Sequence, residues 1–525
     1  MSSFSWQKIK SAYRWHPWHA YLLLALAAII VYSQTLFFDY SYFDDQHLIL
    51  EQSDILERAN PGEIFFNDVF FSSSKVYYRP LLIVSLAWDW YWGQGTVFAF
   101  HFSNFLLHII AAFLLFYLLR LIRTKEQTAF FLSLFFTVHP ALAQAVAWIP
   151  GRNDSLVAIF IFSILIFLSR WFRQERLFDL ICLWLLFLLA LFTKETAALL
   201  PLLALGWVLV FERPFFTWFK LGLATVGAVV AGFIWYLTRT AALGTAGGFL
   251  WESLLNNLLS PLIFLGKVFL PFNLSVYPVP ADTPWLYGVV VLLALIALLI
   301  YSRPFSWPRA LFGFIWFWSF LVLGSLRPDS ELFRNFLEHR LYVSFLGILI
   351  ILRETEKSWQ RLSPLWRRRA LIFIFSLLIV LNWRHTWNFQ DRFHFWKQAV
   401  ASSPHAPLAH RNLGAMYYLE GDLNQAEVLF RRALTLNPQE PMAHNNLAAI
   451  YIDRRDFWRA ESELKKELEI NPFYDLAFFN LGLVYYERGL YQEAGALWQQ
   501  TLKINPRHQE AARMLEFLNQ NLKAQ

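Results

Sequence analysis

Apolar segments alternate with short basic loops through the first 385 residues, and this alternation limits the possible folds more than any other feature. A helix that crosses the hydrocarbon core of a bilayer needs about 20 apolar residues. Over the whole chain, 57% of the residues are hydrophobic and 16% are charged, whereas soluble proteins are about 25% charged. The sequence therefore predicts an all-α, polytopic membrane domain.

Eleven segments are predicted to span the membrane. They are residues 19–38, 98–120, 127–139, 154–170, 177–192, 196–211, 217–238, 285–302, 309–325, 337–352 and 369–384. Two further apolar stretches, 81–92 and 254–272, are placed along the outer surface, because this choice puts most Lys and Arg residues in loops of one side. The amino terminus is then inside and the carboxyl terminus outside.

The net charge of +7 comes from these basic loops. Short cationic clusters between apolar runs are a signal of membrane topology. We therefore expect membrane lipid around the chain and no nucleic-acid partner.

Four prolines, Pro404, Pro438, Pro472 and Pro506, recur every 34 residues near the carboxyl terminus. This period is that of the tetratricopeptide repeat, in which two helices form each unit. The pattern predicts a membrane domain over residues 1–386, with a first outer loop at 39–97, and an extracytoplasmic α-solenoid over 387–525. The solenoid divides into a partial repeat, three repeats and a capping helix: 387–404, 405–438, 439–472, 473–506 and 507–525.

Small residues in the repeats, among them Ala448 and Gly482, are expected at close helix contacts. Stacked repeats form a concave surface suited to an extended segment. The solenoid is thus predicted to bind a polypeptide or another partner, and a self-packing or oligomerisation module is the alternative.

Asp44 and Asp45 stand together in an aromatic loop directly after the first predicted span. Desolvation at the membrane surface raises the pKa of a carboxylate toward the range of a general base. An ordinary solvated loop is the simpler interpretation of the same residues.

Four further polar clusters lie in or beside loops of the same predicted side. They are Arg79 with His101, Asn104 and His108; His139 with Arg152 and Asp154; Lys194 with Glu195; and Glu338 with Arg340 and Tyr342. His101, Asn104 and His108 share a helix face, where a hydrogen-bonded core is favoured over metal ligation. Asp154 is also a possible helix cap, and Lys194–Glu195 a local ion pair. Polar clusters converging on one face favour a site.

These motifs together resemble the transmembrane and tetratricopeptide-repeat O-mannosyltransferases, a family with the GT-C glycosyltransferase fold, and the chain looks like a bacterial relative. The resemblance covers nearly the whole chain. It rests on Phe43-Asp44-Asp45, Tyr78-Arg79-Pro80-Leu81, His101 to His108, His139-Pro140, Gly151-Arg152-Asn153-Asp154, Lys194-Glu195 and Arg340-Leu341-Tyr342.

The resemblance implies a sugar donor, such as mannose, linked to a polyprenyl phosphate, and a hydroxyl acceptor on a polypeptide held by the repeats. It also implies an acidic base, Asp44 or Asp45 with Asp44 favoured, for an inverting displacement. Arg79, Arg152, Lys194 and Arg340 then bind the donor phosphate, and the supporting residues are His101, Asn104, His108, His139, Asp154, Glu195, Glu338 and Tyr342. The family usually has an acid where Gln144 stands. No metal ligand set is assigned, although a divalent metal is compatible with this chemistry.

A non-catalytic membrane scaffold for envelope assembly is the alternative function, and a transporter of a lipid-linked sugar is a third. A transporter needs polar groups along a path through the membrane, whereas these residues gather on one side. The resemblance implies the inner membrane of a bacterium, with the repeats outside the cytoplasm. The alternative is the endoplasmic reticulum membrane with the repeats in the lumen.

Overall fold

The computed structural model describes residues 16–71, 77–244, 257–324 and 336–523, and every regular element in them is helical. The chain forms two compact units, which meet between Phe395 and Trp396. This division falls inside helix α20 (Arg392–Ser402), so the domain boundary at residue 386 stays a prediction.

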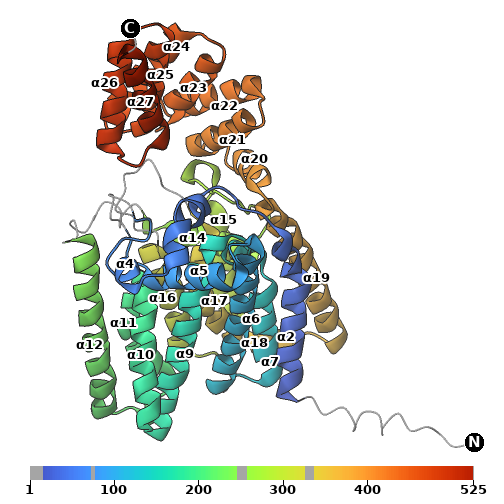
Figure 1. The fold of residues 1–525 in the computed structure, drawn as a ribbon. Helices are drawn as coiled ribbons and strands as arrows, with labels where there is room; N and C mark the ends of the chain where they lie inside the picture. The colour runs from blue at the N-terminus through green and yellow to red at the C-terminus, as the bar shows by residue number, and fades with distance from the viewer. Residues whose placement is uncertain (1–15, 72–76, 245–256, 325–335, 524–525) are drawn as a thin grey trace, which may run out of the picture. The chain divides into compact units, whose positions relative to one another are not determined.

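The membrane unit consists of helices that range in length from 4 to 26 residues (Figure 1). In chain order they are α2 (Pro17–Tyr32), α5 (Pro80–Gly93), α6 (Val97–Leu121), α7 (Glu126–Val138), α8 (Gln144–Ala147), α9 (Arg152–Gln174), α10 (Leu177–Thr193), α11 (Leu200–Phe211), α12 (Trp218–Leu243), α14 (Ser260–Phe269), α15 (Leu286–Tyr301), α16 (Trp307–Gly324), α17 (Leu341–Glu354), α18 (Glu356–Arg361) and α19 (Pro364–Thr386). Prolines in the first turns of α2, α5 and α19 suit helix starts, where an N–H has no intrahelical partner.

Each of the eleven predicted spans overlaps a helix. Only five described helices are by themselves long and apolar enough to cross a membrane, and a sixth qualifies if the bent pair α7–α8 is one span. Others, such as α10 with 17 residues and α15 with 16, are at the lower limit of a spanning length. The chain is therefore a helical membrane protein, and the number eleven is not confirmed.

Small residues set the close helix crossings of this unit. A side chain at Gly313 of α16 would meet the backbone of Gly347 on α17, and one at Gly288 of α15 would meet the backbone of Leu262 on α14. Such approaches are typical of helices that pack within a bilayer.

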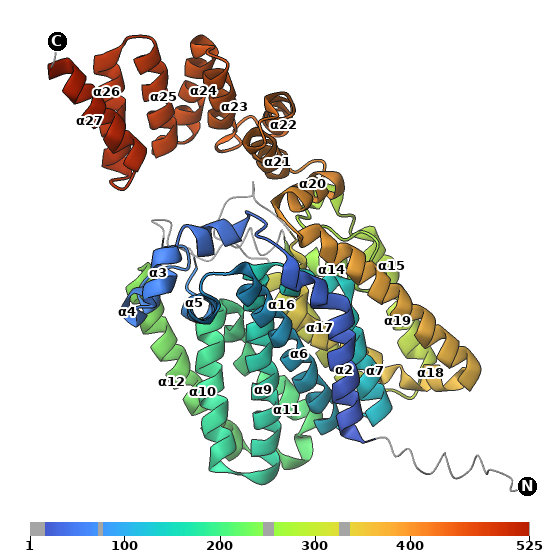
Figure 2. The same cartoon turned by 45° about the vertical axis from the view of Figure 1, so that its right-hand side comes forward.

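The two ends of the helix bundle differ in their contents. At one end lie α3 (Ser53–Arg58), α4 (Pro61–Phe65) and α5, as Figures 1 and 2 show. The other end contains the turns after α6, α9, α11 and α17, where Arg173 pairs with Glu212 and Lys125 pairs with Glu356. The long helices run between the two ends, and the polar loops of the candidate site lie at the first end.

The repeat unit has the predicted helix pairs. They are α21 (Pro407–Leu419) with α22 (Leu423–Leu436), α23 (Ala443–Asp453) with α24 (Phe457–Ile470), and α25 (Asp475–Glu487) with α26 (Tyr491–Ile504), followed by α27 (Gln509–Lys523). The rings of Phe430 and Trp498 occupy the space where Cβ atoms at Gly414 and Gly482 would lie, and Ala448 is fully buried. The expected close contact at Gly482 is thus confirmed, and Ala448 lies in the core of the repeats.

Candidate active site

The loop after α2 places Asp44 and Asp45 in different surroundings. Asp45 is 1% exposed, and its carboxylate accepts hydrogen bonds from Ser41 N, Ser41 Oγ and Phe43 N at 2.6–2.9 Å. Burial raises the pKa of Asp45, and these hydrogen bonds oppose the shift. Asp44 is partly exposed. Asp45 therefore fixes the loop conformation, and Asp44 is the more exposed of the two carboxylates.

Aromatic rings connect this loop to the rest of the bundle. The ring of Phe43, next to Asp44, stacks on Trp148 with centroids 5.5 Å apart. Trp148 in turn lies 5.4 Å from the ring of His339. A row of contacting rings thus extends from the acidic loop toward the turn that contains Arg340.

The first turn of α9 directs three consecutive side chains to three different partners. Asp154 pairs with Lys194, whose Nζ lies 2.7 Å from both carboxylate oxygens. The amide of Asn153, oriented to satisfy its neighbours, accepts from Arg79 Nη1 at 3.2 Å and donates to the carbonyl of Thr193. Arg152 points to α5 instead.

Arg79, Lys194 and Arg340 form the cation cluster of the site, together with the carboxylates of Asp154 and Glu195. Arg79 Nε donates to Glu195 Oε2 at 3.2 Å, and within the described residues its Nη2 has no hydrogen-bond partner. Burial lowers the pKa of Lys194; Asp154 opposes this, and Arg79 and Arg340 add to it. Arg79 pairs with Glu195 and Lys194 pairs with Asp154, and Arg79 and Arg340 both lie near enough to Lys194 to influence its charge. The three cations therefore belong to one cluster.

The turn Glu338–Arg340 joins this cluster from the other side of the bundle. The backbone N–H of His339 donates to Gln144 Oε1 at 3.1 Å, and its Nε2 lies 3.8 Å from Asp154. Gln144 also donates to the carbonyl of Val276. The Gln144 amide thus accepts a hydrogen bond from the His339 N–H and donates one to the Val276 carbonyl. An ionised carboxylate at this position can only accept, so it would leave the Val276 carbonyl without this donor.

Arg152 points to α5 and is buried among partners within the protein. It pairs with Asp89 at 2.5 Å, with both side chains 1% exposed, and donates to Asn104 Oδ1, Ser85 O and Phe100 O. It therefore anchors α5 to α6 and α9, and we leave it out of the donor site proposed below.

The supporting residues have structural partners. The amide of Asn104 donates to the carbonyls of Val146, Trp148 and Ile149, where the chain breaks between α8 and α9. His108 Nδ1 accepts from the Tyr342 hydroxyl at 2.7 Å, His139 lies 2.8 Å from the carbonyl of Val268, and the buried His101 contacts Phe38 edge to face. The carboxylate of Glu338 pairs with Lys267 and lies beside His385.

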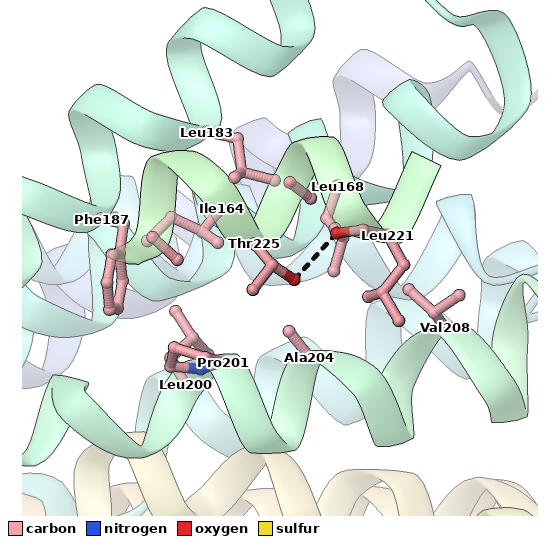
Figure 3. Close-up of a pocket in the computed structure, with 12 residues that line it drawn as sticks. Ile164, Leu168, Leu183, Phe187, Leu200, Pro201, Ala204, Val208, Leu221 and Thr225 are labelled. Atoms are coloured by element: carbon pink, nitrogen blue, oxygen red, sulfur yellow. Dashed lines mark hydrogen bonds between the residues drawn. The ribbon is translucent and has the colours of Figure 1, made fainter. Parts of the chain in front are cut away.

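An apolar pocket, partly open to its surroundings, lies between α9, α10, α11 and α12. Figure 3 shows Ile164, Phe187, Leu200 and Thr225 around it, and the hydroxyl of Thr225 donates to its own helix. Phe187 precedes Lys194 by two helical turns, so the pocket lies roughly 10 Å along α10 from the cation cluster. No group of three His, Cys, Asp or Glu side chains that could hold a metal ion occurs within the described ranges.

The bundle, its polar end and its helix pairs define a helical membrane protein with a tetratricopeptide-repeat array. Residues 407–440 and 476–508 match family models of the tetratricopeptide repeat. Over 177 residues, 32% of this chain and 20% of the relative, it is 30% identical to Protein O-mannosyl-transferase Tmtc1 of Drosophila melanogaster. Over 146 residues, 27% of this chain and 17% of the relative, it is 30% identical to Protein O-mannosyl-transferase TMTC2 of Homo sapiens.

The resemblance to O-mannosyltransferases with tetratricopeptide repeats is thus confirmed, over about a third of this chain and about a fifth of the length of these relatives. Among solved structures, the first tetratricopeptide-repeat domain of Spaghetti bound to an HSP90 peptide is 23% identical. That match covers 22% of this chain and 93% of the domain, with a TM-score of 0.22.

Proposed function

We propose that this chain is a membrane glycosyltransferase that moves a sugar from a polyprenyl-phosphate carrier to a hydroxyl group of a polypeptide. The observation that carries the proposal is the cation cluster of Arg79, Lys194 and Arg340. The rings of Phe43, Trp148 and His339 connect it to the loop of Asp44. The names of the relatives support protein O-mannosyl transfer and make mannose the first sugar to test.

The reaction is a single inverting displacement. Asp44 removes the proton of the acceptor hydroxyl, whose oxygen forms a bond to the anomeric carbon. The bond from that carbon to the phosphate oxygen breaks, and its electron pair leaves with the lipid phosphate. The phosphate gains negative charge in this step, and fixed cations that stabilise developing charge usually supply the largest catalytic effect.

Arg79 and Lys194 are suited to this role because their ion pairs leave N–H groups unused. Arg79 retains Nη2, and Lys194 has a third ammonium hydrogen beyond the two directed at Asp154. A guanidinium group binds phosphate oxygens in a planar fork. The apolar pocket along α10 offers hydrocarbon contacts for part of the carrier chain.

The test is donor consumption by the full chain with a polyprenyl-phosphate mannose, with donor affinity measured separately. Asp44→Asn removes the proton acceptor, so turnover is expected to fall by about 100- to 10,000-fold while donor binding persists. Arg340→Ala is expected to weaken binding as well as turnover. Asp39→Asn, an exposed carboxylate in the same loop, is the matched control and is expected to keep the parent rate.

Asp45→Asn is expected to lower turnover through the loop, because an amide NH₂ would face the N–H groups of Ser41 or Phe43. If Asp44→Asn and Asp45→Asn both turn over at the parent rate, the catalytic assignment of this loop is wrong. The non-catalytic scaffold then becomes the better hypothesis.

We further propose that the repeats bind the acceptor polypeptide along the row of first helices. Helix α23 contacts both α21 and α25, and Asn412, Asn446 and Asn480 occupy equivalent positions 34 residues apart. Packed helices are about 8–10 Å apart, and three residues of extended chain span about 10 Å. An asparagine amide can thus meet the main chain at every third residue.

Replacing these three asparagines by alanine is expected to reduce transfer to a polypeptide and to leave transfer to a small hydroxyl acceptor unchanged. The control replaces Gln425, Gln492 and Gln499, which are exposed on the second helices. Equal loss of both activities in the asparagine variant would indicate a structural role for the row.

We place the chain in a bacterial inner membrane with the amino terminus inside and the repeats outside; the lumen of the endoplasmic reticulum is the equivalent alternative. The basic loops at the end of the bundle that contains α18 support this orientation. Single accessible cysteines after Lys503 and near Asp282 are expected to react from outside, and one near Lys357 from inside. Labelling of the Lys503 and Lys357 sites from the same side would exclude the assignment of α19 as a span.

A further inference from the structure

Lys267 and His385 both contact the carboxylate of Glu338. The sequence does not predict these contacts, because the three residues lie far apart in the chain. Lys267 Nζ lies 2.7 Å from Glu338 Oε1, and His385 Nε2 lies 3.0 Å from Glu338 Oε2. The backbone N–H of Ser275 also donates to Oε1 at 2.9 Å. The three side chains are between 0% and 5% exposed, so the network is closed to solvent.

The polar groups of the network are also supported by neighbours. Asn388 Nδ2 lies 3.4 Å from His385 Nδ1, so both ring nitrogens of His385 have a polar neighbour. The surroundings on α14 are apolar, with Phe264, Leu265 and Val268 all buried.

Stability alone does not account for such a network. Removing charges from water costs free energy that their attraction often fails to recover, and apolar replacements of buried ion pairs are frequently as stable. Buried ionic groups can instead select one conformation among several. The conformation that this network selects is that of the turn that contains Glu338.

Glu338 is the first residue of the short 3-10 turn Glu338–Arg340. The other two residues of this turn, His339 and Arg340, belong to the candidate site. Its side chain ties this turn to α14 through Lys267 and to the end of α19 through His385. The next residue, His339, is tied by its backbone to Gln144, and Arg340 follows directly. The position of the Arg340 guanidinium thus depends on where Glu338 is anchored.

From this arrangement we infer that Lys267 and His385 are positioning residues that hold Arg340 in place for the donor phosphate. They act through Glu338 and do not themselves touch the donor. The inference rests on the proposed function, because Arg340 needs an anionic ligand for the position to matter.

The test measures binding of farnesyl phosphate, a soluble lipid monophosphate, to the purified full chain, together with its unfolding temperature. The main variant combines Lys267→Met with Glu338→Met, which removes both charges and keeps apolar volume. We expect it to unfold near the parent temperature and to bind the probe about 10- to 100-fold more weakly, the scale of effect that follows a displacement of about 1 Å. Lys267→Arg keeps the charge and is expected to recover most of the affinity.

A matched control uses the Arg173–Glu212 pair at the opposite end of the bundle, where Glu212 is fully buried and accepts two hydrogen bonds. Arg173→Met with Glu212→Met is expected to leave probe affinity unchanged. His385→Gln keeps a donor toward Glu338 and is expected to bind like the parent, whereas His385→Leu is expected to bind more weakly. This second pair of variants carries the test if the double methionine variant does not fold.

The outcomes separate the two proposals. If the parent binds the probe and Arg340→Ala abolishes binding, but the double methionine variant of Lys267 and Glu338 and the His385→Leu variant both bind like the parent, the positioning role is wrong and the donor site stands. The positioning role is also wrong if affinity falls only in proportion to unfolding temperature in both methionine pairs. If the parent does not bind the probe through Arg340, the donor site itself fails and the positioning role with it.

Discussion

In the membrane unit, several ion pairs are buried inside the protein, whereas in the repeat unit the recurring pairs lie on helix surfaces. Arg152–Asp89 and Lys267–Glu338 are each at most 3% exposed and join elements far apart in the sequence. In the repeats, Glu427 pairs with Arg454 and Glu461 with Arg488, all partly exposed and spaced by the 34-residue period. The same kind of ion pair can therefore fix the positions of site residues in one unit and lie on the surface of the repeats in the other.

The largest expected effect comes from the buried pair on α5. Arg152→Ala leaves the carboxylate of Asp89 buried without its cation, and the free energy of unfolding should fall by about 3–5 kcal/mol. Unfolding of the full chain in detergent measures this. Arg152→Met combined with Asp89→Leu is the control and should recover most of the loss. A loss below 1 kcal/mol for Arg152→Ala would show that water reaches Asp89 and would remove the contrast between the two units.

A close apolar contact of the repeat unit should give the next largest effect. Gly482→Leu drives a side chain into the ring of Trp498, and overpacking of this kind costs about 1–3 kcal/mol. Loss of helical signal from the repeats, with the membrane unit still folded, is the expected observation. Ala496→Leu places the same residue at an exposed position of α26 and should be neutral.

A substitution at the buried Gln144 should destabilise the membrane unit less than the loss of Arg152. Gln144→Glu loses the hydrogen bond to the Val276 carbonyl and sets a carboxyl group against that oxygen, at an expected cost of about 1–3 kcal/mol. Gln144→Leu separates the loss of hydrogen bonds from the added charge. If Gln144→Glu is as stable as the parent at neutral pH, the neighbouring cations accommodate an acid there, and the departure from the family pattern has no structural cost.

The smallest effect is expected at the repeat surface. Glu427→Ala and Arg454→Ala should each change the free energy of unfolding by less than about 1 kcal/mol, since exposed ion pairs are screened and mobile. The effect should shrink further in high salt. A change as large as that of Arg152→Ala would mean that the surface pairs, too, determine the fold of their unit.

The sequence predicted the repeat unit well because its contacts are local. Leu447 and Ala448 pack within their own helix pair or the next one, and the 34-residue period repeats this geometry. The helical segments of the membrane unit were also predicted, since apolar length is a local property. Their number of spans was not confirmed, because several helices are too short to identify as spans by length alone.

The roles of the polar residues were harder to predict. Arg152 was grouped with the phosphate-binding cations on the basis of a motif, but its guanidinium faces Asp89 on α5. The signal was present, because an acid inside an apolar helix requires a cation or a proton, but nothing local shows which cation it meets. Asn153, Lys267 and His385 gave no local signal of their partners at all.

The sequence by itself determined an apolar helical membrane unit, a 34-residue repeat array and a set of polar clusters near the ends of helices. These follow from hydropathy and period, which depend on neighbours along the chain. Only the tertiary structure decided which carboxylate meets which cation, as in Asp154 with Lys194 and Glu338 with Lys267. Residues so far apart in the chain are brought together by helix packing, and burial then makes each pairing strongly preferred because an unpaired charge in an apolar interior is costly.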